Sequence, residues 1–193
     1  MHNLVTQGKI LYWGTSEWSA QQITEAYAVA RSLGISAPVM EQPEYNLFRR
    51  EKVESEFLPL YDLLGLGTTT WSPLASGFLT GKYNDGIPAD SRVNLPGYEW
   101  LKENLESPEG QDQIAKVRLL SVLADEVGLP LTHLALLWCL SNPRVSTVIL
   151  GASRLSQLQD NLAALDAKDK LTPDVIERIE QIVSNKPAPP ARF

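Results

Sequence analysis

The sequence predicts an α/β domain built on parallel strands, and its regular alternation of elements is the main observation behind this prediction. Segments rich in β-forming residues begin near residues 9, 38 and 68, and helical periodicity follows the first two. Such alternation predicts parallel strands joined by right-handed crossovers. No G-x-G-x-x-G turn, the usual mark of an open doubly wound sheet, is present. The pattern fits either an open sheet or part of a (β/α)8 barrel. A complete barrel has eight strands, twice the number expected in this chain.

End signals define the elements in the first half of the chain. Ser19, with Gln22 three places later, forms a capping box that begins a helix, and Gly34 ends it. A second helix is expected to bend at Pro59 and to end at Gly65. With these limits, strands are expected at 9–16, 38–45 and 68–74, and helices at 19–33 and 52–64.

The second half is expected to begin with a long loop over residues 75–107, and loops of this length are often functional. Ser107-Pro108 and Thr172-Pro173 are helix-starting pairs. Helices are expected at 108–127, 132–140, 155–165 and 173–183, and a fourth strand at 145–153. We predict one domain over 1–186 and a disordered tail over 187–193.

Composition restricts the class of protein. The 193 residues include 44% hydrophobic and 21% charged residues, ordinary for a globular domain. A net charge of −6 without a basic run argues against nucleic-acid binding. The single cysteine, Cys139, favours a reducing, cytoplasmic location. The most apolar stretch, 131–140, is too short for direct membrane insertion, and the first residues do not read as a signal peptide.

Polar residues stand where the expected strands end, namely Ser16, Gln42, Ser72 and Ser153. In parallel α/β architectures ligands bind at the carboxyl ends of the strands. Each residue alone could instead cap a helix or bond the backbone. Their recurrence after four strands favours a ligand site.

Two segments suit anions, although each also has a plain structural interpretation. Residues 151–161 form a strand-to-helix junction whose N–H groups, beside Arg154, are expected to face outward; an ordinary capped helix fits equally. GFLTGK (77–82) is no nucleotide P-loop, because only three residues separate its glycines. Lys82 and Arg92 could still supply charge to phosphates, or simply be solvated.

Catalytic and metal sites are not evident in the sequence. His2 is expected in a frayed terminus and His133 within a helix, and no Cys/His cluster suggests a metal.

Several motifs, in order, resemble the C-terminal half of the aldo-keto reductases, in the branch that contains voltage-gated potassium channel beta subunits. They are YWGTSEWS (12–19), EQPEYNLFRREKVE (41–54), TWSPLASGFLTGKY (70–83), SR (91–92) and the segment 150–161. The resemblance spans about residues 8–186 and implies the second half of a (β/α)8 barrel, with four parallel strands and flanking helices. It also implies NADP(H) lying across the carboxyl ends of the strands.

The resemblance implies a cofactor role for particular residues. Ser16 and Gln42 would bond the nicotinamide carboxamide, and Trp71 would stack on the ring. The ribose and pyrophosphate would lie along Ser72, Pro73, Leu74, Ala75 and Ser76, with Lys82 and Arg92 over the phosphates. The adenosine and its 2′-phosphate would be surrounded by Gly151, Ser153, Gln157, Asp160 and Asn161.

Three residues depart from the family's pattern. Glu17 stands where relatives often have Arg or Asn, and it is therefore left out of the expected site. Asp160 replaces a more common Glu, and Asp90 replaces an aromatic residue.

The family's catalytic Asp, Tyr, Lys and His or Asn belong to the first half of the barrel, so no catalytic residue is carried over. We expect a shortened oxidoreductase of aldehydes or ketones, inactive by itself. The alternative is a cofactor-sensing beta subunit that regulates a potassium channel. Expected partners are NADPH, a small carbonyl substrate if the barrel is completed, a channel alpha subunit and a second copy of the chain. The expected location is cytoplasmic, at a membrane only through a channel partner.

Overall fold

A computed structural model describes residues 1–189, and its sheet confirms the parallel α/β prediction. The strands are β1 (Thr15–Ser16), β2 (Met40–Gln42), β3 (Gly67–Thr70) and β4 (Thr147–Val148). They lie in the order β1-β2-β3-β4, and every neighbouring pair is parallel. This consecutive order is that of an arc of a barrel and lacks the reversal of strand order of an open doubly wound sheet.

Each strand is shorter than the sequence predicts, most clearly the two at the edges of the sheet. Within the expected strand 9–16, only Thr15 and Ser16 form ladder pairs with β2, although Trp13 O still accepts a hydrogen bond from Val39 N. The expected strand 145–153 is likewise reduced to β4. An edge strand has one neighbour, so regular pairing stops where that neighbour turns away.

The helices largely follow the predicted end signals. They are α1 (His2–Thr6), α2 (Ala20–Leu33), α3 (Leu58–Leu64), α4 (Glu99–Glu106), α5 (Pro108–Glu126), α6 (Leu131–Ser141), α7 (Leu155–Ala163) and α8 (Pro173–Val183). Ser19 and Gln22 form the predicted capping box, and Gly34 and Gly65 end their helices in the left-handed conformation. Ser107 and Thr172 cap α5 and α8 through their side chains.

Two expectations about the helices were wrong, and a third, the bend at Pro59, was right only in part. The loop expected over 75–107 contains α4 and two short 3-10 helices, Ala75–Thr80 and Arg92–Asn94. The N-terminus expected to be frayed forms α1, where His2 Nδ1 lies 3.2 Å from Ser36 Oγ. The helix expected over 52–64 is divided into a π-helix, Lys52–Glu56, and α3, because Pro59 stands in the first turn of α3.

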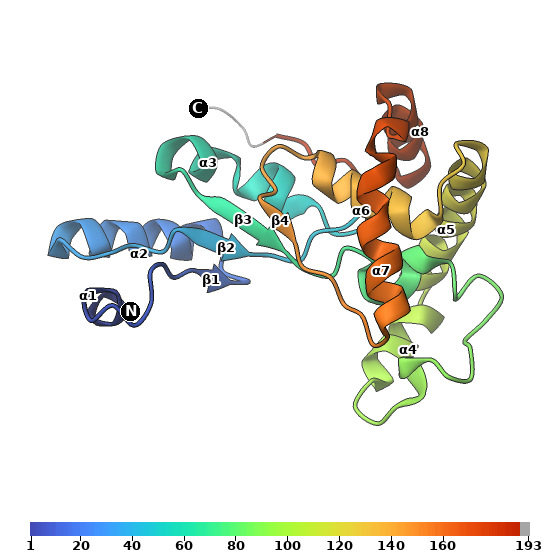
Figure 1. The fold of residues 1–193 in the computed structure, drawn as a ribbon, viewed down its shortest axis with the longest axis horizontal. Coiled ribbons are helices and arrows are strands. Elements are labelled where there is room, and N and C mark those ends of the chain that lie inside the picture. Colours follow the sequence, from blue (N-terminus) through green and yellow to red (C-terminus); the bar gives the residue numbers. More distant parts are fainter. Residues whose placement is uncertain (190–193) are drawn as a thin grey trace.

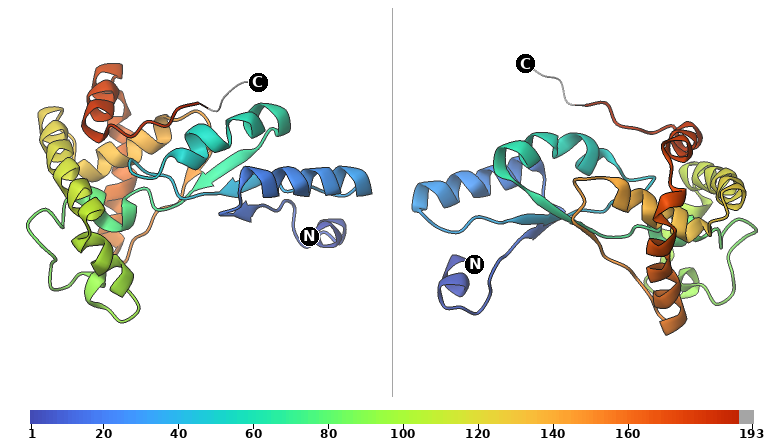
Figure 2. Two further views of the ribbon diagram at one scale, coloured as in Figure 1. Left: turned by 180° about the vertical axis from the view of Figure 1, so that it is seen from behind. Right: turned by 45° about the horizontal axis from the view of Figure 1, so that its top comes forward.

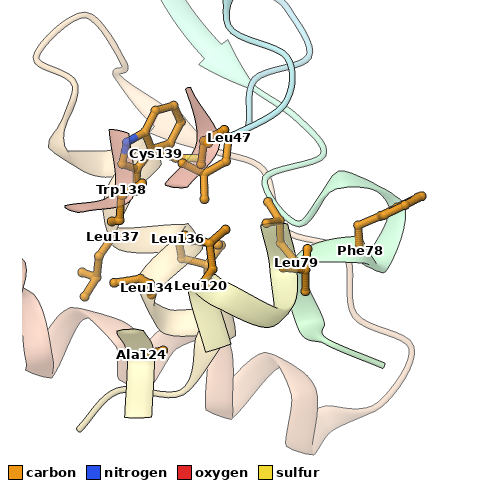
Figure 3. Close-up of a cluster of buried hydrophobic side chains, with 14 of the residues drawn as sticks. Leu47, Phe78, Leu79, Leu120, Ala124, Leu134, Leu136, Leu137, Trp138 and Cys139 are labelled. Carbon is orange, nitrogen blue, oxygen red and sulfur yellow. The ribbon is translucent and has the colours of Figure 1, made fainter. Parts of the chain in front are cut away.

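The main core lies among the helices α4, α5, α6 and α8. Figure 3 shows Leu134, Leu136 and Leu137 of α6 beside Leu120 and Ala124 of α5. α6 is buried over seven consecutive residues, His133 to Cys139. A helix that is buried on all sides needs apolar residues on every face, and the sequence of α6 has this character. α4 closes the cluster with its buried Leu101 and Leu105, and this apolar i, i+4 spacing explains its helix.

A second, smaller cluster joins α2 and α3 to the sheet, through Ile23, Phe57, Leu60, Tyr61 and Leu66. Figure 1 shows the strands extending away from α5–α8, with α2 at the far end. In both views of Figure 2, α2 and α3 lie along the strands while α4–α8 gather at the opposite end. Burial alternates along the strands accordingly: Glu41, Thr68 and Thr70 are buried, whereas their neighbours Gln42 and Thr69 are half-buried.

The chain after α8 runs back along the π-helix. Asn185 Nδ2 donates to the carbonyl of Leu47, and Ser55 Oγ donates to the carbonyl of Ala188. Residues 190–193, the end of the tail predicted to be disordered, lie outside the described residues. Within residues 1–189 no single helix has both the length and the apolar composition to cross a membrane, although α5 and α6 pass as a pair bent by 93°.

Candidate functional site

The carboxyl ends of the strands meet near the centre of the molecule, where Trp71 follows β3 (Figure 1). The backbone of Trp71 is fixed on the β2 side, because its N–H donates to Pro43 O and its carbonyl accepts from Tyr45 N–H, both at 3.1 Å. The indole itself is only half-buried. The fold therefore presents a large aromatic face on a rigid backbone at this edge.

Backbone strain is concentrated around this edge. Among residues 1–189, five residues other than glycine have positive φ, and four of them are Glu17, Ser72, Ala75 and Ser76. Each such conformation costs about 1–3 kcal/mol and persists where surrounding contacts enforce it. Strain of this kind gathers at ligand-binding sites, and here it follows the ends of β1 and β3.

Asn46 is one of the contacts that enforce the turn after Trp71. It is fully buried, and its Nδ2 donates to the carbonyl of Ser72 at 3.0 Å. Its Oδ1 accepts from the N–H groups of Phe48 and Arg49, an Asx-type turn that fixes its own loop. The side chain of Asn46, which was not among the predicted site residues, thus fixes the backbone of Ser72. The signal available was a short polar residue between the apolar Tyr45 and Leu47.

Glu17 makes the most direct contact with Trp71. Its Oε1 accepts from Trp71 Nε1 at 3.0 Å and from Glu44 N–H at 2.6 Å, and its Oε2 accepts from Lys52 Nζ at 2.6 Å. Burial raises the pKa of the Glu17 carboxyl, but these donors outweigh it and hold the pKa below its ordinary value. Glu17, which the prediction left out, therefore places an ionised carboxylate against the indole edge.

Ser16 and Gln42 lie side by side at the ends of β1 and β2. They are register partners, and Ser16 Oγ donates to the carbonyl of Gln42 at 3.0 Å. The side-chain amide of Gln42 bonds no residue within 1–189. A half-buried amide with both donor and acceptor free suits a ligand carboxamide.

Small residues continue the edge after Trp71. Pro73 is buried, while Leu74, Ala75 and Ser76 are half-buried, and Leu74 and Ala75 pack on the main core. Ser72 Oγ accepts from Ser76 N–H at 3.4 Å, which closes the strained turn. These predicted residues therefore form one continuous turn.

Lys82 and Arg92 lie on exposed parts of the segment that follows. Lys82 Nζ lies 4.9 Å from the centre of the Tyr83 ring, and the Arg92 guanidinium lies 5.6 Å from that of Tyr98. Neither forms an ion pair with a carboxylate among residues 1–189. Both cations thus remain available to an anion.

The junction after β4 differs from its prediction. The N–H groups of Ser153 and Arg154, expected to face outward, donate to Gln157 Oε1 at 2.9 Å and 3.2 Å. Gln157, three residues into the helix start, caps it as glutamine does in a capping box. Gly151 and Ser153 are exposed, and Arg154 lies 3.8 Å from Asp90 of the 75–107 segment. The junction and that segment therefore approach each other.

Asp160 and Asn161 are on α7 but face different surroundings. Asp160 is exposed and lies 3.4 Å from Nε2 of the buried His133, whereas Asn161 is buried against the helical body. Within residues 1–189 no cluster of His, Cys, Asp or Glu could hold a metal ion.

The comparisons with known proteins fit this architecture. The model of the Aldo/keto reductase family matches residues 1–184. This chain belongs to the aldo/keto reductase family.

Named relatives are also closely similar. A protein of Arabidopsis thaliana named "Probable voltage-gated potassium channel subunit beta" is 53% identical over 194 residues, covering 100% of this chain and 58% of the relative. A protein of the same name from Oryza sativa subsp. japonica is 54% identical over 188 residues, 97% of this chain and 56% of the relative. The chain therefore spans a little over half the length of these relatives.

The residues present fit a nicotinamide dinucleotide. An aromatic face at Trp71, a free amide at Gln42 and uncommitted cations at Lys82 and Arg92 match a flat ring, a carboxamide and phosphates. Among the predicted residues, Asp160 fits the cofactor least, because its carboxylate is directed at His133.

Proposed function

We propose that this chain forms the NADP(H)-binding half of an aldo/keto reductase-type oxidoreductase that acts on aldehydes or ketones. The observation that carries the proposal is the indole of Trp71 on a rigid and strained edge, whose backbone pairs with the chain just after Gln42, a residue with a free side-chain amide. Bound NADPH would supply the hydride for carbonyl reduction.

The chain's own residues would bind and orient the cofactor. Trp71 would pack against the nicotinamide ring, Gln42 and Ser16 would bond its carboxamide, and the turn from Ser72 to Ser76 would follow the ribose and pyrophosphate. Lys82 and Arg92 would pair with phosphate, and the β4–α7 junction with Gly151, Ser153, Gln157 and Asn161 would receive the adenosine end. The family resemblance assigns no catalytic residue to residues 1–193, so we expect binding without carbonyl-dependent oxidation of NADPH.

Calorimetric titration of the chain with NADPH tests this proposal. Replacing Trp71 with Ala removes the stacking face and should weaken binding by at least about fivefold, equivalent to roughly 1 kcal/mol. Trp100→Ala is the matched control, because Trp100 is 53% exposed on α4. Equal affinities of the Trp71→Ala variant and the unaltered chain would refute the proposed stacking. Robust carbonyl-dependent turnover by the chain would refute the absence of catalytic residues.

A second candidate function is regulation of a voltage-gated potassium channel, and the printed names of the two plant relatives favour it. In this role the chain would be cytoplasmic and would reach the membrane only through the channel. Co-purification of the chain with the cytoplasmic region of such a channel tests it. Retention above that of an unrelated protein of similar charge is expected, and no retention would reject this role.

Self-association is a further expectation, because β1 and β4 are edge strands with unpaired backbone groups on their outer sides. Size-exclusion chromatography with light scattering measures it directly. A stable monomer over a wide concentration range would contradict pairing of two copies.

A further inference from the structure

The carboxylate of Glu17 occupies a position from which it can act on both the orientation of Trp71 and the charge beside it. Glu17 has φ of 60°, a conformation that costs energy in a residue other than glycine. Its side chain reaches the indole that follows β3, where Oε1 lies 3.0 Å from Trp71 Nε1. One carboxylate oxygen thus fixes the indole edge.

The charged groups around Glu17 lie on the π-helix and on the chain that follows β2. Lys52 of the π-helix pairs with it at 2.6 Å, and the side chains are 44% exposed for Glu17 and 29% for Lys52. Glu44 donates its N–H to Glu17, and burial raises the pKa of the carboxyl of Glu44. A hollow of about 300 Å³, lined by Glu17, Glu44, Arg49 and Lys52 among others, opens on this side. Glu17 and Lys52 therefore form an ion pair in this hollow, with the side chains of Glu44 and Arg49 beside it.

The two redox forms of a nicotinamide cofactor differ in charge at the ring. The oxidised ring carries a positive charge and the reduced ring is neutral, while the phosphates are the same in both. A fixed charge near the ring therefore changes the ratio of the two affinities, and contributions from phosphate contacts cancel in this ratio.

We propose that Glu17 is a positioning and specificity-determining residue, which holds the Trp71 indole in place and favours the oxidised cofactor over the reduced one. The positive charge of Lys52 acts in the opposite direction on the ratio of the two affinities. The inference rests on the proposed binding of NADP(H) at Trp71 and adds a preference between redox forms.

Calorimetric titration with NADP⁺ and NADPH separates these effects in three variants. Glu17→Gln preserves shape and can still accept the Trp71 hydrogen bond, but removes the charge. Its ratio of Kd for NADP⁺ to Kd for NADPH should rise by about 1.5-fold to 5-fold, as for one charge at a partly exposed site. Lys52→Met should lower the same ratio. Glu103→Gln, an equal change of charge at an exposed position of α4, should leave it unaltered.

The opposite signs distinguish an electrostatic role from a structural one. A shift of the ratio in the same direction in both variants, or none in Glu17→Gln, overturns the inference while the cofactor site itself stands. Binding of neither redox form by the unaltered chain refutes the proposed function, and the inference with it. Glu17→Ala should additionally weaken both forms, because it also releases the indole; unchanged affinity for both would refute the positioning role.

Discussion

The strand region, residues 9–74, and the helical body, residues 75–183, differ widely in the buried apolar packing that they contain. Twenty-five buried residues form the cluster centred on the helical body, while the cluster that packs α2 and α3 onto the strands has five. The strands also have unpaired edges, and the residues of one face of β2 and β3 remain half-buried. The candidate site lies where the sparsely packed region meets the densely packed one, and we expect the sparsely packed region to be the less stable.

The largest expected effect comes from removing a core side chain of the helical body. Leu134→Ala leaves a cavity at a fully buried position of α6 and should lower the free energy of unfolding by about 2–5 kcal/mol. Leu60→Ala in the smaller cluster should cost less, because a sparsely packed site collapses more easily. Chemical denaturation measures both. Equal losses would show that the two clusters are equally well packed.

Arg50 joins the two regions and should have the next largest effect. Its guanidinium, 3% exposed, bonds Glu54 in the π-helix and Glu180 in α8, and it lies over the Trp138 ring. Burial alone would lower the pKa of Arg50, but the two carboxylates raise it, so the group stays charged. Arg50→Met leaves both carboxylates without their cation and should cost about 3 kcal/mol.

The matched control for Arg50 is Arg178→Met, which breaks the exposed pair with Glu126 on the surface of the helical body. Little change in stability is expected there. If the two variants lost the same stability, Arg50 would not be the link between the regions.

Removal of helix caps tests the same comparison between the two regions, with a smaller expected effect on stability. Ser107→Ala removes the cap of α5 and should lower global stability by about 1 kcal/mol. Ser19→Ala removes the cap of α2, and we expect its loss to appear mainly as faster hydrogen exchange of the α2 amides. Exchange that is equally slow in α2 and α6 of the unaltered chain would contradict a less stable strand region.

The smallest expected effect is a pH dependence of stability that arises from Glu41, a buried residue of β2. Burial raises the pKa of its carboxyl above the ordinary 4.5, and bonds from Thr15 and the Trp18 N–H offset only part of this. Since the folded pKa exceeds the unfolded one, this contribution is present at low pH and is lost as the pH rises through the folded pKa.

Glu41→Gln removes that titration, so the variant should gain stability relative to the unaltered chain as the pH rises above the ordinary pKa of 4.5. Denaturation at several pH values measures the difference. Glu25→Gln, at an exposed position of α2, is the control. A relative loss of stability in the Glu41 variant as the pH rises would reverse the assigned sign.

Local chemistry explains why some features could be predicted from the sequence. The pairs Ser19 with Gln22, Ser107 with Pro108 and Thr172 with Pro173 define helix starts because capping involves residues only a few positions apart. The βα alternation gave the parallel sheet for the same reason, since each element and its ends are encoded locally. The motifs around Trp71 and Gln42 also pointed to the edge where the structure brings them together.

Tertiary contacts decided the rest. Glu17 was left out because its identity departs from the family's pattern, and only the folded chain brings it to Trp71, 54 positions away. Asn46 behind Ser72, Gln157 across the N–H groups of Ser153 and Arg154, and the link from Arg50 to Glu180 likewise join partners that the sequence alone does not pair. The sequence by itself determined the order of elements and their ends; the packing of distant segments determined which polar groups remained free for a ligand.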